Sequence, residues 1–414
     1  MLQNILKKIT YANLLNIRKS LPAAALWVLI LAGCSEDPGV VGGSFVDESS
    51  EVYSDTLNIE DVRSSSDIPD FSGNLEHFSA GLYNDPALGE FEAVAIMRPS
   101  ISQSYNIDSL RDVEFSDARL QFVANTGKFY GDTTSTTTFE LRPVTHIWRP
   151  GSWRSDSLPS YGSTRIGQPF EVTNQDTFEV DLPDTWLQEY REYFNSDVAN
   201  RDSVYRYNFN GMAIVAQNQS KIVPFNRQGT RLMIKNREDT AYKKLPMESV
   251  AFGFNRNEPA QMDSTLTPVV GLFDNAMILN PELNEQTLGS QNLSRVELAL
   301  YEDQETLNNL PVNHVRPGIP EMRVYRRSPD EVRYGISQEN RLYRVAEDSL
   351  DNSYRINLTS YVNQIIYGQD PGVQFYVVPE SSSGVIYATL LYNSKSAEFR
   401  PKVLVTGAKT ESVN

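Results

Sequence analysis

Short stretches of alternating apolar and polar residues run through most of the chain beyond residue 50. In one of them Ala118, Leu120 and Phe122 alternate with Arg119 and Gln121. Successive side chains of a strand point to opposite faces, so this pattern predicts a strand with one face in a core and the other in solvent. The same alternation is found at 296–300, 373–377 and 403–405.

Helical periodicity is confined to two short segments, 184–194 and 360–367. In the first, Trp186, Leu187 and Tyr190 fall on one helical face, which predicts that Trp186 is a core residue. The remaining chain consists of short strand patterns separated by Gly, Pro, Asn, Asp and Ser, which favour turns. Many short strands with regular turn signals are typical of β-sandwiches. We therefore predict an all-β protein with short helical turns.

The second half of the chain repeats the order of patterns in the first half. Four pairs of similar segments follow one another at a nearly constant separation: 118–124 with 296–301, 178–182 with 354–358, 211–215 with 372–376, and 232–234 with 403–405. This order predicts two tandem sandwiches, at 51–240 and 245–408, with a polar joint at 236–244. Residues 409–414 are expected to form a tail.

The N-terminal segment has the organisation of a secretory signal. A basic lead, with Lys7, Lys8, Arg18 and Lys19, precedes an apolar run at 21–33. This run of 13 residues would rise only about 20 Å as a helix, less than the roughly 30 Å of a bilayer core. We predict a cleaved signal peptide at 1–33, with an uncleaved anchor as the alternative. The following Gly-, Ser- and acid-rich residues 34–50 are predicted to be a flexible tether.

The end of that segment, Leu31-Ala32-Gly33-Cys34, resembles the lipobox of bacterial lipoproteins. The resemblance implies that Cys34 is lipidated, with palmitate among its acyl chains, and becomes the first residue. Cys34 is the only cysteine, so no intramolecular disulfide competes for it. Ser35-Glu36-Asp37 resembles the surface-export signal of Bacteroidota lipoproteins, although an acidic linker would look the same. These features predict lipid anchoring at the outer membrane, with the protein exposed on the surface.

Charge and residue inventory narrow the possible chemistry. The formal net charge of −16 repels phosphate backbones, so we expect no nucleic-acid partner. The 3 histidines have no metal-like spacing, and the 53 acidic residues make carboxylate pairs unavoidable by chance. Calcium at the Asn84-Asp85 or Gly131-Asp132 turn is a weaker interpretation than simple turn formation. We therefore predict no metal, no cofactor and no catalytic residues, and hence a protein that is not an enzyme, with an enzyme acting on glycans as the weaker alternative.

Two tryptophans and their neighbours form the candidate binding surface: Trp148, Arg149, Trp153 and Arg154. Flat aromatic faces stack on sugar rings, and charged neighbours supply polar contacts. The alternative is that the tryptophans fill the sandwich core. An acidic polysaccharide would need a local basic patch in this acidic chain, for which the candidates are Arg142, Arg149, Arg154 and Arg165.

The order of these segments resembles the DNRLRE-type β-sandwich, a jelly-roll module of secreted and surface bacterial proteins. The similarity rests on the strand at 118–124, the tryptophans Trp148 and Trp153, and the Pro- and Gly-containing loop at 157–167. Arg400-Pro401 resembles the start of the closing strand of that module. The second half has no tryptophan, which is a departure from the pattern. The resemblance implies jelly-roll-like sandwiches, and some relatives of the module bind acidic polysaccharides.

The whole plan also resembles a domain-of-unknown-function family of Bacteroidota lipoproteins, in which a lipobox is followed by a GxYNDPxxG turn and two sandwiches. The matching residues are Gly81, Tyr83, Asn84, Asp85, Pro86 and Gly89. The family implies no activity. We expect a non-enzymatic, lipid-anchored envelope protein that serves as a scaffold or accessory subunit of an outer-membrane assembly, with an envelope protein as its partner. The alternative is a surface carbohydrate-binding protein that recognises a polysaccharide, acidic ones included.

Overall fold

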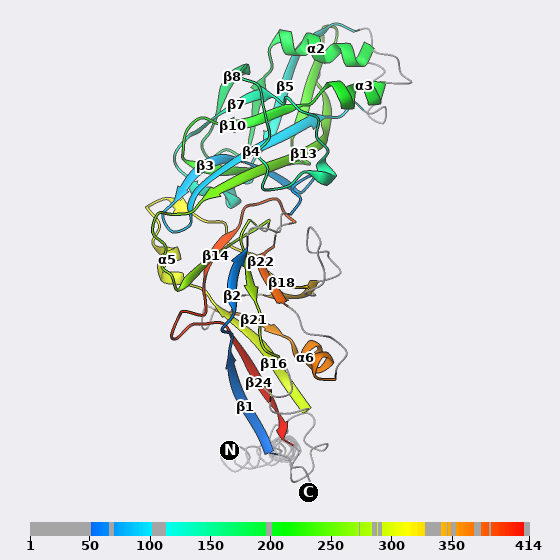
Figure 1. The fold of residues 1–414 in the computed structure, drawn as a ribbon. Helices are drawn as coiled ribbons and strands as arrows, with labels where there is room; N and C mark the ends of the chain where they lie inside the picture. The colour runs from blue at the N-terminus through cyan, green and yellow to red at the C-terminus, as the bar shows by residue number, and fades with distance from the viewer. Residues whose placement is uncertain are drawn as a thin grey trace, which may run out of the picture. The chain divides into compact units, whose positions relative to one another are not determined.

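Antiparallel β-sheets account for most of the regular structure in the computed structural model (Figure 1). The structure describes residues 51–409 except 66–69, 102–112, 196–200, 273, 284–287, 289–291, 328–340, 346, 349–352, 368–373 and 381. The predicted signal peptide, lipobox, Cys34 and tether therefore lie outside the described residues, as does the tail beyond Lys409. No helix in the described part of the chain combines the length and the apolar character needed to cross a bilayer.

The chain divides into two compact units. One comprises Met1–Tyr53 and Ala408–Asn414, and the structure describes only its residues 51–53 and 408–409. The other spans Ser54–Gly407 and is the subject of the following description.

One group of strands comes mainly from the first half of the chain. It forms a 12-stranded sheet, with helices α2 (Asp184–Asn195) and α3 (Arg201–Asn208) between β9 and β10. Its strands are β3 (His77–Asp85), β4 (Gly89–Pro99), β5 (Phe115–Val123), β6 (Tyr130–Asp132), β7 (Thr137–Pro143), β8 (Ile166–Val172), β9 (Thr177–Asp181), β10 (Met212–Ala216), β11 (Lys221–Asn226), β12 (Arg231–Asn236), β13 (Lys243–Asn257) and β17 (His314–Val315).

The other group combines the second half with the N-terminal strands. Its sheets have the orders β1-β24-β16-β21-β20, β19-β18-β22-β15-β2 and β14-β23. The strands are β1 (Glu51–Asn58), β2 (Val62–Ser65), β14 (Leu266–Val270), β15 (Ala276–Leu279), β16 (Asn292–Tyr301), β18 (Met322–Arg327), β19 (Arg341–Val345), β20 (Glu347–Asp348), β21 (Ser353–Asn357), β22 (Gln374–Pro379), β23 (Ala388–Tyr392) and β24 (Lys402–Lys409), with helices α5 (Gln304–Asn308) and α6 (Thr359–Ile366).

The fold is an all-β sandwich of antiparallel sheets, as the alternating pattern predicts. Both predicted helical segments are present, as α2 and α6. Helices α3 and α5 were not predicted. The sequence of α3, RDSVYRYN, is mostly polar, and α5 has only 5 residues, so neither offers a clear apolar face.

The order of pairing is the same in the two halves. In the first, β5 lies between β12 and β9, and α2 follows β9; in the second, β16 lies between β24 and β21, and α6 follows β21. Likewise the order β4-β10-β7-β8 in the first half corresponds to β15-β22-β18-β19 in the second. We call these two sets of strands the first repeat and the second repeat.

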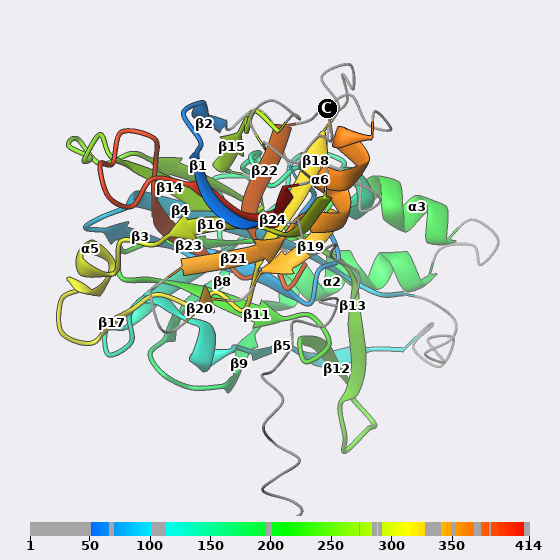
Figure 2. The same ribbon diagram turned by 90° about the horizontal axis from the view of Figure 1, so that it is seen from below.

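The sheets do not divide at the expected boundary between 240 and 245. Strand β13 begins at Lys243 but pairs with β12 and β4 of the first repeat. Strands β1 and β2, which fall in the predicted range 51–240, belong instead to the sheets of the second repeat, beside β24 and β15 (Figure 2). The reason is that residue alternation identifies a strand without specifying its partner. The prediction therefore placed β1, β2 and β13 with the strands that follow them in the sequence.

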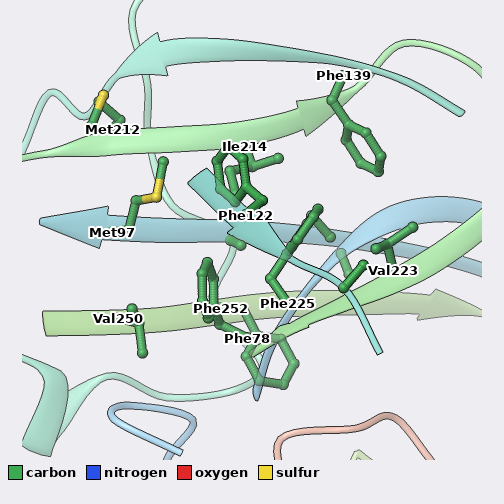
Figure 3. Close-up of a cluster of buried hydrophobic side chains, with 14 of the residues drawn as sticks. Phe78, Met97, Phe122, Phe139, Met212, Ile214, Val223, Phe225, Val250 and Phe252 are labelled. Carbon is green, nitrogen blue, oxygen red and sulfur yellow. The ribbon is translucent and has the colours of Figure 1, made fainter. Parts of the chain in front are cut away.

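The core of the first repeat is built largely from aromatic side chains on facing strands (Figure 3). The ring of Phe122 on β5 lies 5.2 Å from that of Phe225 on β11, and the latter lies 5.9 Å from Phe139 on β7. Helix α2 adds Trp186, which is 6% exposed and stacks on Tyr190 at 4.8 Å. Trp186 is therefore a core residue, as its helical spacing predicts.

A buried ion pair at the β3–β4 turn connects the two repeats. The side chain of Asp85 is 0% exposed, and Arg316 donates hydrogen bonds to it from Nε and Nη2, each at 2.6 Å. Tyr130 donates a third hydrogen bond at 2.9 Å, and the backbone N–H groups of Ala87 and Leu88 donate two more. The GxYNDPxxG turn thus presents a carboxylate whose acceptor sites are taken by protein donors, and the weaker alternative of calcium at this turn has no support here.

A second contact beside this ion pair comes from the same connection between β16 and β18 of the second repeat, whose short strand β17 belongs to the 12-stranded sheet. Tyr83 shares a hydrogen bond with Nδ1 of His314 at 3.0 Å, and β17, which contains His314, pairs with β6. Burial raises the pKa of Tyr83 to about 12, so its phenol is neutral near pH 7. Although desolvation raises the pKa of nearby Asp132, hydrogen bonds from Ser135 and Thr134 outweigh it and hold that pKa well below its usual value.

Replacing Asp85 by Asn tests how far the fold depends on this ion pair. The change keeps the shape of the side chain but leaves Arg316, whose side chain is 9% exposed, as a buried cation without its counter-charge. We expect the free energy of unfolding, measured by urea denaturation, to fall by about 3–5 kcal/mol.

The matched control is Glu114→Gln, which breaks an ion pair with Arg237 in which both side chains are more than half exposed. We expect that variant to lose less than about 1 kcal/mol. Equal losses in the two variants would contradict the role assigned to Asp85.

Candidate functional site

A pocket of about 450 Å³ lies where β13 passes from its partner β12 to its partner β4. Four parts of the chain form its wall: the end of β4, the loop that carries the predicted tryptophans, helix α3 and β13. The side chains that decide its chemistry are Arg98, Trp148, Arg149, Arg206, Tyr207 and Glu248.

A β-bulge in β13 shapes one wall of this pocket. The register with β4 shifts between Met247 and Ser249, so Glu248 is an extra residue without an opposite partner. Bulges of this kind bend a strand and redirect a side chain. Here the bulge accompanies the change of partner strand, and it places Glu248 and Ser249 in the pocket wall.

Arg98, at the end of β4, is the most buried charged group of the pocket, with a side chain that is 6% exposed. It donates from Nη1 to the carbonyl oxygen of Arg206 at 3.3 Å and from Nη2 to Oγ of Ser249 at 3.4 Å. Its Nε has no hydrogen-bond partner among the described residues and lies 3.8 Å from Oε2 of Glu248. Buried N–H groups are nearly always paired, so this nitrogen is an exception in the pocket wall, and the nearby Glu248 carboxylate balances part of the charge of Arg98.

Trp148 is held in place from two sides. Its Nε1 donates to the carbonyl oxygen of Asn210 at 2.6 Å, and the guanidinium carbon of Arg98 lies 5.4 Å from the ring centroid. The residue is only 4% exposed, so it forms a fixed wall and supports the Arg98 guanidinium through a cation–π contact.

The outer part of the pocket is more accessible. Tyr207 and Ile147 are 58% and 56% exposed, and Arg149 is also exposed. Arg206 donates from Nε to Oε1 of Glu248 at 2.8 Å. Three arginines and one glutamate thus line a site that also offers apolar and aromatic surface, and its local charge is positive in a chain of net charge −16.

The structure brings only two of the four predicted site residues into this pocket, Trp148 and Arg149. Trp153 is half-buried, stacks on His146 at 5.3 Å and packs against an apolar cluster that includes Trp148. Arg154 donates to Asp156 from Nε at 2.9 Å and does not line the pocket. Trp153 therefore packs, with its own loop, against one face of the sheet formed by β4, β10 and β13.

The predicted basic patch is also largely neutralised. Arg142 and Arg165 both donate to Glu140, at 2.8 and 3.2 Å, and Arg154 is paired with Asp156. Residues two apart on a strand share a face, which is why Glu140 and Arg142 meet. Arg149 is the member of the patch that lines the pocket.

Sequence reasoning missed Arg98, Arg206 and Tyr207. The last two lie on α3, which was not predicted. Arg98 gave a usable signal, because it directly follows the apolar run Ala93–Met97 within a buried strand, and a charged residue there needs a specific environment. Within the described residues, no group of His, Cys, Asp and Glu is placed to hold a metal ion.

Comparisons with known proteins add little to this picture. No family model matches the chain, and no curated protein matches it. A crystal structure of a protein from Parabacteroides distasonis that is assigned as secreted aligns over 85% of this chain and all of that one, with 6% identity and a TM-score of 0.20. The tandem CBM22 domains of Paenibacillus barcinonensis Xyn10C align over 86% of this chain and 93% of that one, with 9% identity and a TM-score of 0.12. Scores at this level do not establish a common fold, and nothing is transferred from either protein.

Proposed function

We propose that the chain is a lipid-anchored envelope protein that binds an acidic polysaccharide, without catalysis, through the pocket beside Trp148. The observation that carries this proposal is the buried guanidinium of Arg98 in the pocket wall, whose Nε has no hydrogen-bond partner among the described residues. A ligand carboxylate is a good acceptor for such a group, because hydrogen bonds between two charged partners are stronger than neutral ones.

The remaining walls suit a sugar ring that carries the carboxylate. Exposed Tyr207 offers an aromatic face on which the C–H surface of a pyranose can pack, and exposed Arg149 adds a second cation. Ser203 and Ser249 supply hydroxyl groups for hydrogen bonds to the sugar. The volume of about 450 Å³ lies within the usual range for small-ligand sites.

The proposed location rests on the N-terminal sequence. A lipobox that ends in Cys34 supports lipid anchoring at the outer membrane, and Ser35-Glu36-Asp37 supports export to the surface. A polysaccharide-binding protein at that surface would meet its ligand without transport across the membrane.

A scaffold or accessory role in an outer-membrane assembly is the second candidate. It is favoured by the Asp85–Arg316 ion pair and by strands that cross between repeats, which hold Ser54–Gly407 as one compact unit. Such a unit could present a fixed surface to an envelope protein while it remains attached through the lipid.

Binding to alginate and polygalacturonate, with neutral dextran as a reference, tests the first candidate. We expect the protein to bind both anionic polymers and not to bind dextran. Arg149→Gln should weaken binding at least about tenfold, because a lost charge-assisted hydrogen bond costs about 1.5–3 kcal/mol. Arg98→Lys should also weaken it, since lysine keeps the charge but has no planar fork. The measurement is isothermal titration calorimetry on the purified protein.

Arg154→Gln is the matched control, because it removes the same charge a few residues away and outside the pocket. We expect it to bind as the unchanged protein does. If Arg154→Gln and Arg149→Gln weaken binding equally, or if neither polymer is retained, the pocket is not a polysaccharide site.

Labelling of growing cells with radioactive palmitate tests the anchor. We expect the label to enter the protein, to be lost in Cys34→Ser and to persist in Ser35→Ala, because only the thiol of Cys34 can carry the lipid. Protease added to intact cells should then digest the protein if it is surface-exposed. Label that persists in Cys34→Ser would rule out the proposed attachment.

Crosslinking in cells followed by mass spectrometry tests the scaffold role. An accessory subunit should be joined repeatedly to the same envelope protein, and Asp85→Asn should reduce that product because it loosens the contact between repeats. Capture of glycan alone would count against this role and leave polysaccharide binding as the supported function.

A further inference from the structure

The strands that precede each repeat in the sequence pair with the other repeat. We call β1 and β2, which precede the first repeat, and β13, which precedes the second, the leading strands. In the first repeat, β13 pairs with β12 through Lys243–Pro246 and with β4 through Met247–Asn257. In the second repeat, β24 corresponds to β12 and β15 corresponds to β4. Strand β24 pairs with β1, and β15 pairs with β2. Figure 2 shows β2 beside β15 and β1 beside β24. Residues from the start of the chain thus take the place in the second repeat that β13 takes in the first.

In each repeat there is a corner, where the leading strand changes from one partner strand to the next. The backbone contacts at the two corners support this equivalence. Ser100, the residue after β4, donates its N–H to the carbonyl oxygen of Pro246 at 2.8 Å. Asn280, the residue after β15, donates its N–H to the carbonyl oxygen of Asp61 at 3.0 Å. Each corner also borders a pocket, and the one at the second corner, of about 490 Å³, is lined by residues 56–61 and 280–283 with Val403.

The two leading strands differ in how firmly they are packed. In β13, Leu245, Val250, Ala251 and Phe252 are each 0% exposed. In the segment 54–65 only Ile59 is fully buried, at 2% exposed. The segment is held by backbone pairing and by polar contacts, such as those of Asp61 with Asn280 and of Glu60 with Arg400.

From these contacts we infer that residues 54–65 are a donor segment, and that β24 and β15 form a strand-binding site whose occupant is this segment of the chain. With one buried side chain to hold it, the segment opens more easily than the core strand β13. When it opens, the edges of β24 and β15 lose their pairing partners. Main-chain hydrogen bonds then give a separate copy of the same segment a site to bind, as in other cases of strand addition. This inference does not rest on the proposed function.

Hydrogen exchange on the full chain, followed by mass spectrometry, tests the inference. Ile59→Asp removes the one buried anchor of the segment. We expect exchange to rise at least tenfold in β15 and in 402–407 of β24, and to stay unchanged in β4 and β12. Thr56→Asp, at an exposed position of the same segment, is the matched control and should leave both sets of strands unchanged. A rise that is equal in both repeats would overturn the inference.

A peptide of residues 51–65 provides the decisive second arm. Added to the Ile59→Asp protein, it should bind and restore slow exchange in β15 and β24, whereas the same peptide with Asp at position 59 should not. A merely structural role for Ile59 would not produce this rescue in trans. Failure of the unchanged peptide to bind the opened protein would refute the strand-binding site.

A disulfide test covers the case in which Ile59→Asp does not fold. Arg63 lies directly opposite Ile278 in the β2–β15 pair. In a Cys34→Ser background, Arg63→Cys with Ile278→Cys should form a disulfide on oxidation and slow exchange in β15. Arg63→Cys with Met277→Cys should not, because neighbouring residues point to opposite faces. If the first pair fails to form the bond, the segment does not occupy this site.

Discussion

The carboxylate of Asp85 carries the constraint on which the joined repeats depend. A buried carboxylate is tolerated only when its charge is balanced and its acceptor sites are filled. The turn supplies two backbone N–H groups and β6 supplies Tyr130, but the counter-charge, Arg316, comes from the second repeat. The Asp85 carboxylate is therefore neutralised by the connection between β16 and β18 of the second repeat, and the GxYNDPxxG turn is the feature that positions this carboxylate.

The exchange of leading strands imposes the same dependence on the backbone. A repeat that kept its own leading strand could fold alone, with all sheet edges closed locally. Here β13 closes the first repeat although it precedes the strands of the second, and β2 closes the second although it precedes β3. The ion pair and the strand exchange together join the two halves of the chain within the compact unit Ser54–Gly407.

The residue pattern predicted individual strands and helices, and it failed where a structure depends on which distant segment pairs with it. Alternation at 118–124 identified β5, and apolar spacing at Trp186 identified both α2 and its buried face. It could not reveal that β13 crosses the expected boundary, because a strand pattern is the same whichever neighbour completes it. For the same reason it grouped Arg154 with Arg149, although Asp156 pairs with the first of these. Arg98 and Arg206 are 108 residues apart and meet only through the fold.

The equivalent corners of the two repeats show how one fold position can support different chemistry. At both, the chain changes from one partner strand to the next, and a hollow lies beside the change of partner. In the first repeat the hollow is lined by three arginines with Trp148 and Tyr207, whereas Glu60, Asp61 and Glu282 give the second an acidic lining. The two hollows therefore occupy equivalent places in the fold, and the side chains determine what each can bind. An anionic ligand suits only the first, so duplication of the fold need not have duplicated the binding site.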